Sequence, residues 1–373
     1  MNYSFRKLMN DLHLWLGIAS GLILFIVCLT GTIYTFRTEI EEWLEPHKFE
    51  VEVLENKPLA IETLITKVEA QTQGKVVGFT IPTRLDQSYS FTVKKSLKER
   101  RGKKYYVNAY NGTVLGNSDS SSKPFFMIIF KLHRWLLLDM EIGRIIVGSA
   151  TLIFVFLCFS GLILWFPRKW KRRNFKQGLK IKTNANWKRI NYDLHNTLGF
   201  YALIIMLIMA LTGLCWSFDW YRTGLGNMIG TEIWGRSKEK IISDTLQISS
   251  KMNYDALQNT IENEVNYKGI LKVYLPNKKE DVISIRTYNP EKWSPSTPDK
   301  LIVDQYSGKI LKTTIFSELP LNERIANLIY PLHTGEIYGI YSKIIYCIVC
   351  LIATTLPVTG TIIWINKLKK KKK

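Results

Sequence analysis

The sequence predicts an α-helical polytopic membrane protein, with a four-helix transmembrane bundle from a tandem duplication and two small α+β domains outside the membrane. Two observations predict this fold class. The chain of 373 residues contains four long apolar runs, and each exceeds the roughly 20 helical residues that cross a bilayer. The basic residues, which give a formal net charge of +20, gather beside these runs.

The apolar runs define the predicted spans. They cover residues 12–36, 142–166, 198–218 and 340–365. The first run is too long for the apolar region of a cleavable signal peptide, and no small-residue cleavage site follows it. We therefore expect it to remain as a membrane helix, with the lipid bilayer as a partner of the chain.

Lysine and arginine are concentrated on one side of the predicted membrane. Two precede the first span, ten lie in the stretch 168–189 between the second and third spans, and six follow the fourth. The positive-inside rule therefore predicts that both termini and the central loop are cytoplasmic. Because topology and anionic lipid account for this basic composition, no nucleic-acid partner is expected.

This topology divides the chain into eight segments. The predicted boundaries are 1–37 for the tail and first span, 38–124 for the first outside domain, 125–167 for an interfacial segment and the second span, 168–190 for the basic cytoplasmic loop, 191–218 for the third span, 219–329 for the second outside domain, 330–366 for an interfacial segment and the fourth span, and 367–373 for the basic cytoplasmic tail.

The two outside segments share one order of elements. Each opens with a helical pattern, at 61–68 and at 254–265, and continues with short alternating strands. Each then presents a hairpin, VNAYNGTVL at 107–115 and VDQYSGKIL at 303–311, and the two align without a gap. The repeated order predicts a tandem duplication of a unit made of span, outside domain and span.

The spans repeat as well, and four of the five histidines fall into the repeat. His13 and His195 lie at the cytoplasmic ends of the first and third spans, while His133 and His333 precede the second and fourth. One interpretation is that they are interfacial residues that cap helix ends. Their presence at repeat-related positions favours a functional role, because ionisable groups in membrane segments usually have one.

Haem is the cofactor that best fits these residues. No carboxylate or cysteine accompanies the histidines at the spacing of another metal site. Haem takes one imidazole from each side, and Gly17 and Gly199 share the helix faces of His13 and His195, where a flat ring needs space. Ordinary close helix packing is the alternative for both glycines.

The membrane face predicts which histidines share an iron. Ligands lie about 2 Å from a metal, whereas the two faces of a bilayer core lie about 30 Å apart. We therefore pair His13 with His195 and His133 with His333. Basic residues near the second pair are candidates for haem propionates, namely Arg134, Arg144 and Lys343. We interpret Arg6, Lys7 and Arg189 as interfacial anchors.

These stretches resemble the PepSY-associated transmembrane helix family. The likeness covers essentially the whole chain and is carried by DLHLWLGIASGLILFIVCLTGTIYTF, VNAYNGTVLG, GRIIVGSATLIFVFLCFSGLILWFPRK and PLHTGEIYGIYSKIIYCIVCLIATTLPVTGTIIW. The resemblance implies a multi-pass protein of the bacterial inner membrane with two PepSY-like periplasmic domains. It also implies two b-type haems with histidine ligands, for which His13, His195, His133 and His333 are the matching positions.

The family includes iron-regulated membrane proteins and haem-containing ferrisiderophore reductases, which implies an oxidoreductase. Electrons would come from a cytoplasmic reductase or a quinol and pass to a ferric siderophore or another periplasmic acceptor. The alternative is a non-enzymatic envelope protein whose PepSY-like domains bind or inhibit a partner such as a peptidase. No dinucleotide-binding or phosphate-binding motif occurs in the sequence.

Overall fold

The chain forms two compact units in the computed structural model, which describes residues 4–96, 98–235, 241–245 and 253–371. The described residues of the helical unit fall within 1–37, 124–233 and 328–373. Those of the sheet unit fall within 38–123 and 234–327. Lys372 and Lys373 of the predicted basic tail lie outside the described residues.

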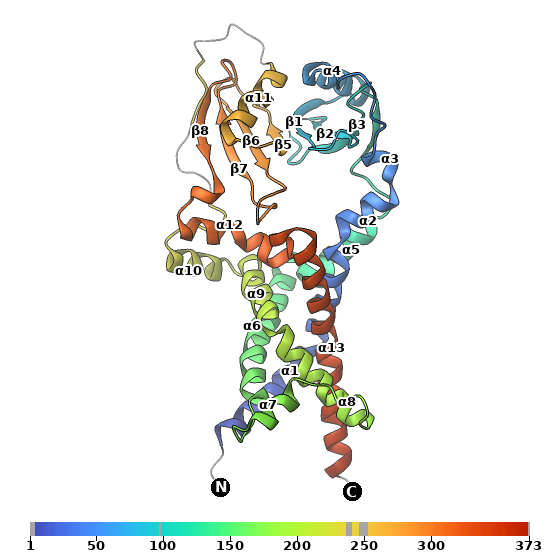
Figure 1. Ribbon diagram of the computed structural model, residues 1–373, viewed down its shortest axis with the longest axis vertical. Helices are drawn as coiled ribbons and strands as arrows, with labels where there is room; N and C mark the ends of the chain where they lie inside the picture. Colours follow the sequence, from blue (N-terminus) through green and yellow to red (C-terminus); the bar gives the residue numbers. More distant parts are fainter. Residues whose placement is uncertain (1–3, 97, 236–240, 246–252, 372–373) are drawn as a thin grey trace. The chain divides into compact units, whose positions relative to one another are not determined.

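Four helices of the helical unit are long and apolar enough to cross a membrane, which confirms the four predicted spans. They are α1 (Phe5–Thr35), α6 (Met140–Trp165), the continuous stretch Trp187–Ser217 and α13 (Ile340–Lys371). They run side by side as a bundle, and α1 begins at the end of the bundle where α13 ends (Figure 1).

The third span is not a uniform α-helix. It consists of α8 (Trp187–Asp193), the π-helical turn η1 (Leu194–Leu198) and α9 (Gly199–Ser217). The helical stretch begins before the predicted residue 198, because the side chain of Asn186 accepts a hydrogen bond from the backbone nitrogen of Arg189 and caps α8. The π-helical turn contains His195.

Shorter helices complete the helical unit. They are α5 (Lys123–Trp135), α7 (Arg172–Gly178), α10 (Asp219–Ile229), the 3-10 turn η3 (Glu336–Tyr338) and the part of α12 (Leu321–Thr334) from Leu328 onward, since the earlier residues of α12 belong to the sheet unit. The helix α10 belongs to this unit, although the sequence analysis assigned its residues to the second outside domain. His133 and His333 lie near the C-terminal ends of α5 and α12.

The sheet unit contains one antiparallel sheet of eight strands in the order β4-β3-β2-β1-β5-β6-β7-β8. The strands are β1 (Lys75–Ile81), β2 (Tyr89–Lys94), β3 (Lys103–Val107), β4 (Val114–Asn117), β5 (Ile270–Tyr274), β6 (Ile283–Tyr288), β7 (Asp299–Val303) and β8 (Ile310–Thr314). Both predicted hairpins are present, and Gly112 and Gly308 adopt the positive φ that their turns require, 77° and 72°.

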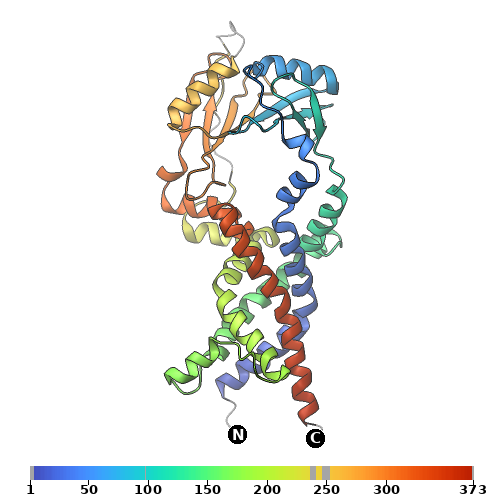
Figure 2. The same ribbon diagram turned by 45° about the vertical axis from the view of Figure 1, so that its right-hand side comes forward.

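The two outside segments share this sheet through the pairing of β1 with β5, which the sequence analysis did not predict. Unpaired, both strands would be sheet edges with exposed backbone groups, and their pairing satisfies those groups. The helices α4 (Ile61–Thr72) and α11 (Tyr254–Val265) cover one face of the sheet (Figures 1 and 2). Apolar residues of both helices and of the strands form one core there. The helices α2 (Arg37–Leu44) and α3 (Pro46–Phe49) and the 3-10 turn η2 (Phe316–Glu318) complete the unit.

Candidate cofactor sites

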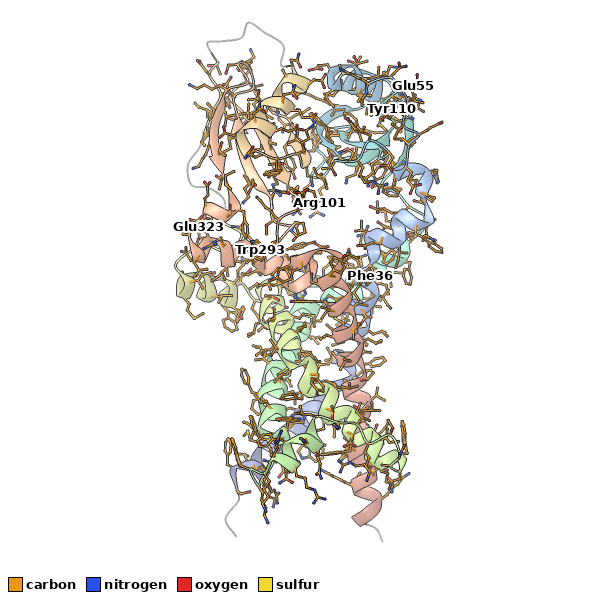
Figure 3. All side chains as sticks on the ribbon, in the orientation of Figure 1. Phe36, Glu55, Arg101, Tyr110, Trp293 and Glu323 are labelled. Atoms are coloured by element: carbon orange, nitrogen blue, oxygen red, sulfur yellow. The ribbon has the colours of Figure 1, made fainter. Side chains whose placement is uncertain are left out.

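The first histidine pair lies inside the bundle, where α1 faces η1. The ring centroids of His13 and His195 are 6.3 Å apart, and the ring planes are perpendicular. Both histidines line a cavity of about 670 Å³ that all four spans border, and the side chains of the bundle are drawn in Figure 3. This volume is within the range of roughly 300–1,000 Å³ that is typical of ligand and cofactor sites.

The second pair joins α5 to α12. The ring centroids of His133 and His333 are also 6.3 Å apart, and the ring of Trp216 lies 5.0 Å from that of His333. His133 contacts α1 at Thr30, which the rise of the helix places about 26 Å from His13. The structure therefore brings together the same two histidine pairs that the sequence analysis expected, toward opposite ends of the bundle.

Each histidine packs against a Ser-Gly or Thr-Gly dipeptide of a neighbouring span, which we call its seat. The seats of His13, His195, His133 and His333 are, in that order, Ser160-Gly161, Thr359-Gly360, Thr30-Gly31 and Thr212-Gly213. Every span contributes one seat. The hydroxyl contacts the Nδ1 atom of the imidazole, and the glycine lies against the edge of the ring.

The seat hydroxyls determine which nitrogen of the first pair carries the proton. Ser160 Oγ donates to the carbonyl of Phe156 at 2.9 Å and lies 2.9 Å from His13 Nδ1. With the hydroxyl hydrogen on that carbonyl, the hydroxyl oxygen accepts from Nδ1, which then carries the ring proton. Thr359 lies 2.9 Å from His195 Nδ1 and donates to the carbonyl four residues before it in the same way.

Backbone carbonyls impose the same tautomer on the second pair. His133 Nδ1 donates to the carbonyl of Val27 at 2.9 Å, and His333 Nδ1 donates to that of Met209 at 2.9 Å. A carbonyl oxygen only accepts, so Nδ1 carries the proton in both rings. Within the part of the chain that the structure describes, Nε2 of all four histidines makes no hydrogen bond. Nε2 is therefore the nitrogen whose lone pair is available to a metal.

The seat glycines leave space for the imidazole rings. A Cβ atom added at Gly161 or Gly360 would lie 3.3 or 3.2 Å from the ring of the seated histidine, and one at Gly31 or Gly213 would lie 3.1 or 3.0 Å from it. Carbon atoms pack best at about 3.5–4.0 Å. A Cβ atom at these positions would therefore require the imidazole to shift by a few tenths of an ångström.

Gly17 and Gly199, the glycines that the sequence analysis selected, have a different place. Both line the cavity of the first pair. A Cβ atom at Gly17 would contact Leu157 at 3.9 Å, and one at Gly199 would contact Leu356 at 3.7 Å. These are ordinary packing distances, so the two glycines widen the cavity without touching a histidine.

The basic residues expected near the second pair have partners of their own. Arg144 contacts Asp219 at 3.7 Å, Lys343 contacts Glu336 at 3.9 Å, and the guanidinium of Arg134 lies over two aromatic rings of α5. The buried Nε of Arg144 has no hydrogen-bond partner among the described residues. Arg144 thus retains one donor that an anionic ligand would satisfy.

Four basic residues line the cavity of the first pair, namely Arg6, Lys7, Arg168 and Lys367. The sequence analysis interpreted the first two as membrane anchors. Their place at the cavity puts cationic groups where the carboxylates of a bound cofactor would need them. Arg189, the third predicted anchor, forms an ion pair at 2.9 Å with a buried carboxylate of its own helix.

The donor set of each pair fits haem. An imidazole nitrogen binds a metal at about 2.0 Å and lies about 1.2 Å from its ring centre, so ligands on opposite sides of one metal have ring centres about 6.4 Å apart. Both pairs measure 6.3 Å. No group of three or more histidine, cysteine or acidic side chains gathers as a metal site in the described chain. Two imidazoles alone are too few for zinc, whereas a porphyrin supplies its own four equatorial nitrogens.

Each half of the chain positions its own histidines. His13 is seated on α6 and His133 on α1, both in the first half, while His195 is seated on α13 and His333 on α9, both in the second. Each pair, in contrast, takes one histidine from each half. A ligand between the rings of a pair would therefore bridge the two halves.

Residues 11–367 match the family model described as the PepSY-associated TM region. The chain belongs to this family. The match spans nearly the whole chain and covers the four seats, the sheet unit and all of the spans except the ends of the first and the fourth. No match to a curated protein was found.

The sequence analysis of this PepSY-associated chain missed the roles of the seats. Thr30-Gly31, Thr212-Gly213, Gly161 and Gly360 had no part in the predicted histidine sites. The signal was nevertheless present, because a serine or threonine followed by glycine occurs at the corresponding position of every span. Only the structure shows that each dipeptide meets a histidine of another helix.

Proposed function

We propose that the chain holds two b-type haems, one between His13 and His195 and one between His133 and His333, and transfers electrons across the membrane. The observation that carries the proposal is the ring separation of 6.3 Å in both pairs, with Nδ1 engaged in all four histidines. When bound, haem would supply reversible one-electron transfer at each end of the bundle.

The chain's own residues would hold and orient these groups. Each histidine offers Nε2 because its seat or a backbone carbonyl retains the proton on Nδ1. The seat glycine allows the ring to approach the neighbouring helix. Arg6, Lys7, Arg168 and Lys367 at the first cavity, and the free donor of Arg144 near the second pair, supply positive charge for carboxylates.

The distribution of basic residues supports an orientation in the bacterial inner membrane with both termini and the loop 168–190 in the cytoplasm. The His13–His195 pair then lies toward the cytoplasm, where a reductase or a quinol would donate electrons. The His133–His333 pair lies toward the periplasm. We propose a ferric siderophore as the acceptor there, since one electron converts Fe(III) to Fe(II), which oxygen-rich chelators hold far less tightly.

We also propose that the bundle and the sheet arose by tandem duplication. The four seats support this origin, because each occupies the corresponding position of its span. The strand order supports it as well, since β1 to β4 and β5 to β8 follow one another outward from a central β1–β5 pairing. A duplication of one two-histidine unit supplies ligands for both sides of a ring.

The function is tested with purified protein reduced by dithionite. We expect a b-type spectrum typical of two imidazole ligands, and reoxidation by a ferric siderophore that yields about two Fe(II) per chain in a ferrous trap. The double variant His133→Ala and His333→Ala should retain the first haem and lose the activity. A wild-type protein without a haem spectrum, or a double variant as active as the wild type, contradicts the proposal.

The seat hydroxyl of Thr359 gives a finer prediction. The variant Thr359→Val removes the hydroxyl that contacts His195 Nδ1, so haem retention at the first pair should fall by about 10–100-fold, and Thr359→Ser should restore it. Transfer of haem to apomyoglobin measures retention. The matched control is Thr355→Val, since Thr355 is exposed on the same helix and its hydroxyl donates only to the carbonyl of Ile352 at 2.7 Å. If Thr355→Val lowers haem retention as much as Thr359→Val does, the seat hydroxyl has no specific role in haem binding.

A further inference from the structure

The sheet has one face whose outward residues are basic. Alternate residues of a strand point to opposite faces, and those beneath α4 and α11, such as Leu271, Ile285 and Leu301, are buried in the core. The intervening residues point to the opposite face. We call five of the positively charged residues there the basic face, namely Lys104, Lys272, Arg286, Lys300 and Lys312.

The register of the strands places these cations side by side. Lys272 of β5 is directly opposite Arg286 of β6, and Arg286 is directly opposite Lys300 of β7. Like charges in directly opposite positions destabilise a sheet. The eight strands contain a single acidic residue, Asp299, which is buried on the covered face. The strands therefore supply no neutralising charge to the basic face.

The two central cations of the basic face share one aromatic neighbour. Lys272 and Arg286 both lie over the ring of Tyr274, at 5.6 and 5.4 Å from its centroid. Within the described chain neither forms an ion pair, whereas Lys103 at the start of β3 pairs with Asp119. Arg286 is exposed and Lys272 is half-buried. Their charge is available to a ligand.

The repulsion among the cations of the basic face also acts on Lys104 and Lys300. Burial, and then the charge of Lys272, lowers the pKa of Lys104. Burial, and then the charge of Arg286, lowers the pKa of Lys300. The acidic neighbours of these two lysines, Glu42 and Glu323, act in the opposite direction without cancelling the shifts. A bound anion would relieve this repulsion.

We propose that the basic face binds the ferric substrate as a polyanionic aromatic chelate of the tris-catecholate type. The inference rests on the proposed ferric-siderophore reductase function and names its substrate class. Each catecholate arm brings two negative charges, so its complex with a trivalent ion is anionic, whereas a complex with three hydroxamates is neutral. Catecholate rings also stack on guanidinium and tyrosine side chains.

The test uses a redox-inert probe, the gallium(III) tris-catecholate complex, and the full-length protein in nanodiscs of zwitterionic lipid. Calorimetry should detect binding of this complex and at least about tenfold weaker binding of a gallium(III) trihydroxamate. The double variant Lys272→Gln and Arg286→Gln should weaken catecholate binding by about tenfold or more. The matched control is Lys268→Gln with Lys309→Gln, which removes the same charge from exposed positions outside the strands.

The outcomes separate this inference from the proposed function. Gallium binding that depends on Lys272 and Arg286, in a protein that releases no Fe(II), supports the basic face and contradicts the reductase. Fe(II) release without a catecholate preference, or equal weakening in the control variant, overturns the basic face and leaves the reductase standing. If the two cations affect only association with anionic lipid, the face belongs to the membrane surface and the inference fails.

Discussion

Replacing His13 and His195 together by alanine should remove one haem and leave the other, so the content falls from about two haems per chain to about one. The double variant His133→Ala and His333→Ala should do the same to the second haem. Each ring of a pair is seated by its own half of the chain, so loss of one pair leaves the contacts of the other unchanged. A pyridine haemochrome assay measures the content.

The single variants test the pairing itself. His13→Ala and His195→Ala should remove the same spectral component. A haem iron that keeps only one imidazole ligand is five-coordinate, and the protein holds that haem weakly. The control is His47→Ala, since His47 lies in the sheet unit on α3 and has no part in either pair. Loss of different components from His13→Ala and His195→Ala would show that the pairs are wrong, even if haem is bound.

Substitution of the seat glycines should disturb haem binding in a graded way. Alanine at Gly31 or Gly213 places a methyl group 3.1 or 3.0 Å from the seated imidazole, closer than the optimal carbon contact of about 3.5–4.0 Å. The ring must shift, and we expect the second haem to be held about tenfold less tightly. Valine adds two further methyl groups and should abolish that haem. The first haem should remain in both series.

The matched control for Gly31→Ala is Gly21→Ala in the same helix. A Cβ atom at Gly21 would meet Pro357 at 3.6 Å, an ordinary contact. Both substitutions raise helix propensity by about 1 kcal/mol, so a difference between them reports the histidine seat rather than the stability of α1. Haem titration with a spectroscopic readout at each site measures the effect. If Gly21→Ala weakens haem binding as much as Gly31→Ala, the seat has no special role.

The sequence predicted the features that depend on local pattern. The spans follow from apolar length, the hairpins from their turn glycines, and the two histidine pairs from the repeat together with the thickness of the bilayer. The contacts of Ser160 and Thr359 with histidines could not be predicted, because a hydroxyl in a membrane helix usually donates its hydrogen bond to a carbonyl of its own helix. Its second contact, with an imidazole, depends on how two helices cross, and no local pattern encodes that.

The strands of the sheet could likewise be predicted from local sequence, but their pairing could not. Strands such as β5 and β6 are visible as alternating sequence, but the pairing of β1 with β5 joins residues almost two hundred positions apart. The row formed by Lys272, Arg286 and Lys300 exists only because the register of three strands aligns them. Each of these basic residues alone is typical of a solvent-exposed strand position, and nothing in the sequence indicates that the three are neighbours.

The arrangement of the seats has a consequence for biogenesis. During synthesis the first half emerges first, and His13 and His133 can reach their seats before any residue after the loop 168–190 exists. Under the proposed ligation, neither haem can gain its second ligand until the later half has inserted, so cofactor capture becomes the last event of assembly. The two haems would then add a link within the bundle between halves that helix packing and the β1–β5 pairing also join. A chain cut within that loop and made as two polypeptides would retain every seat and the β1–β5 pairing, and the supply of haem should strengthen the association of the two polypeptides.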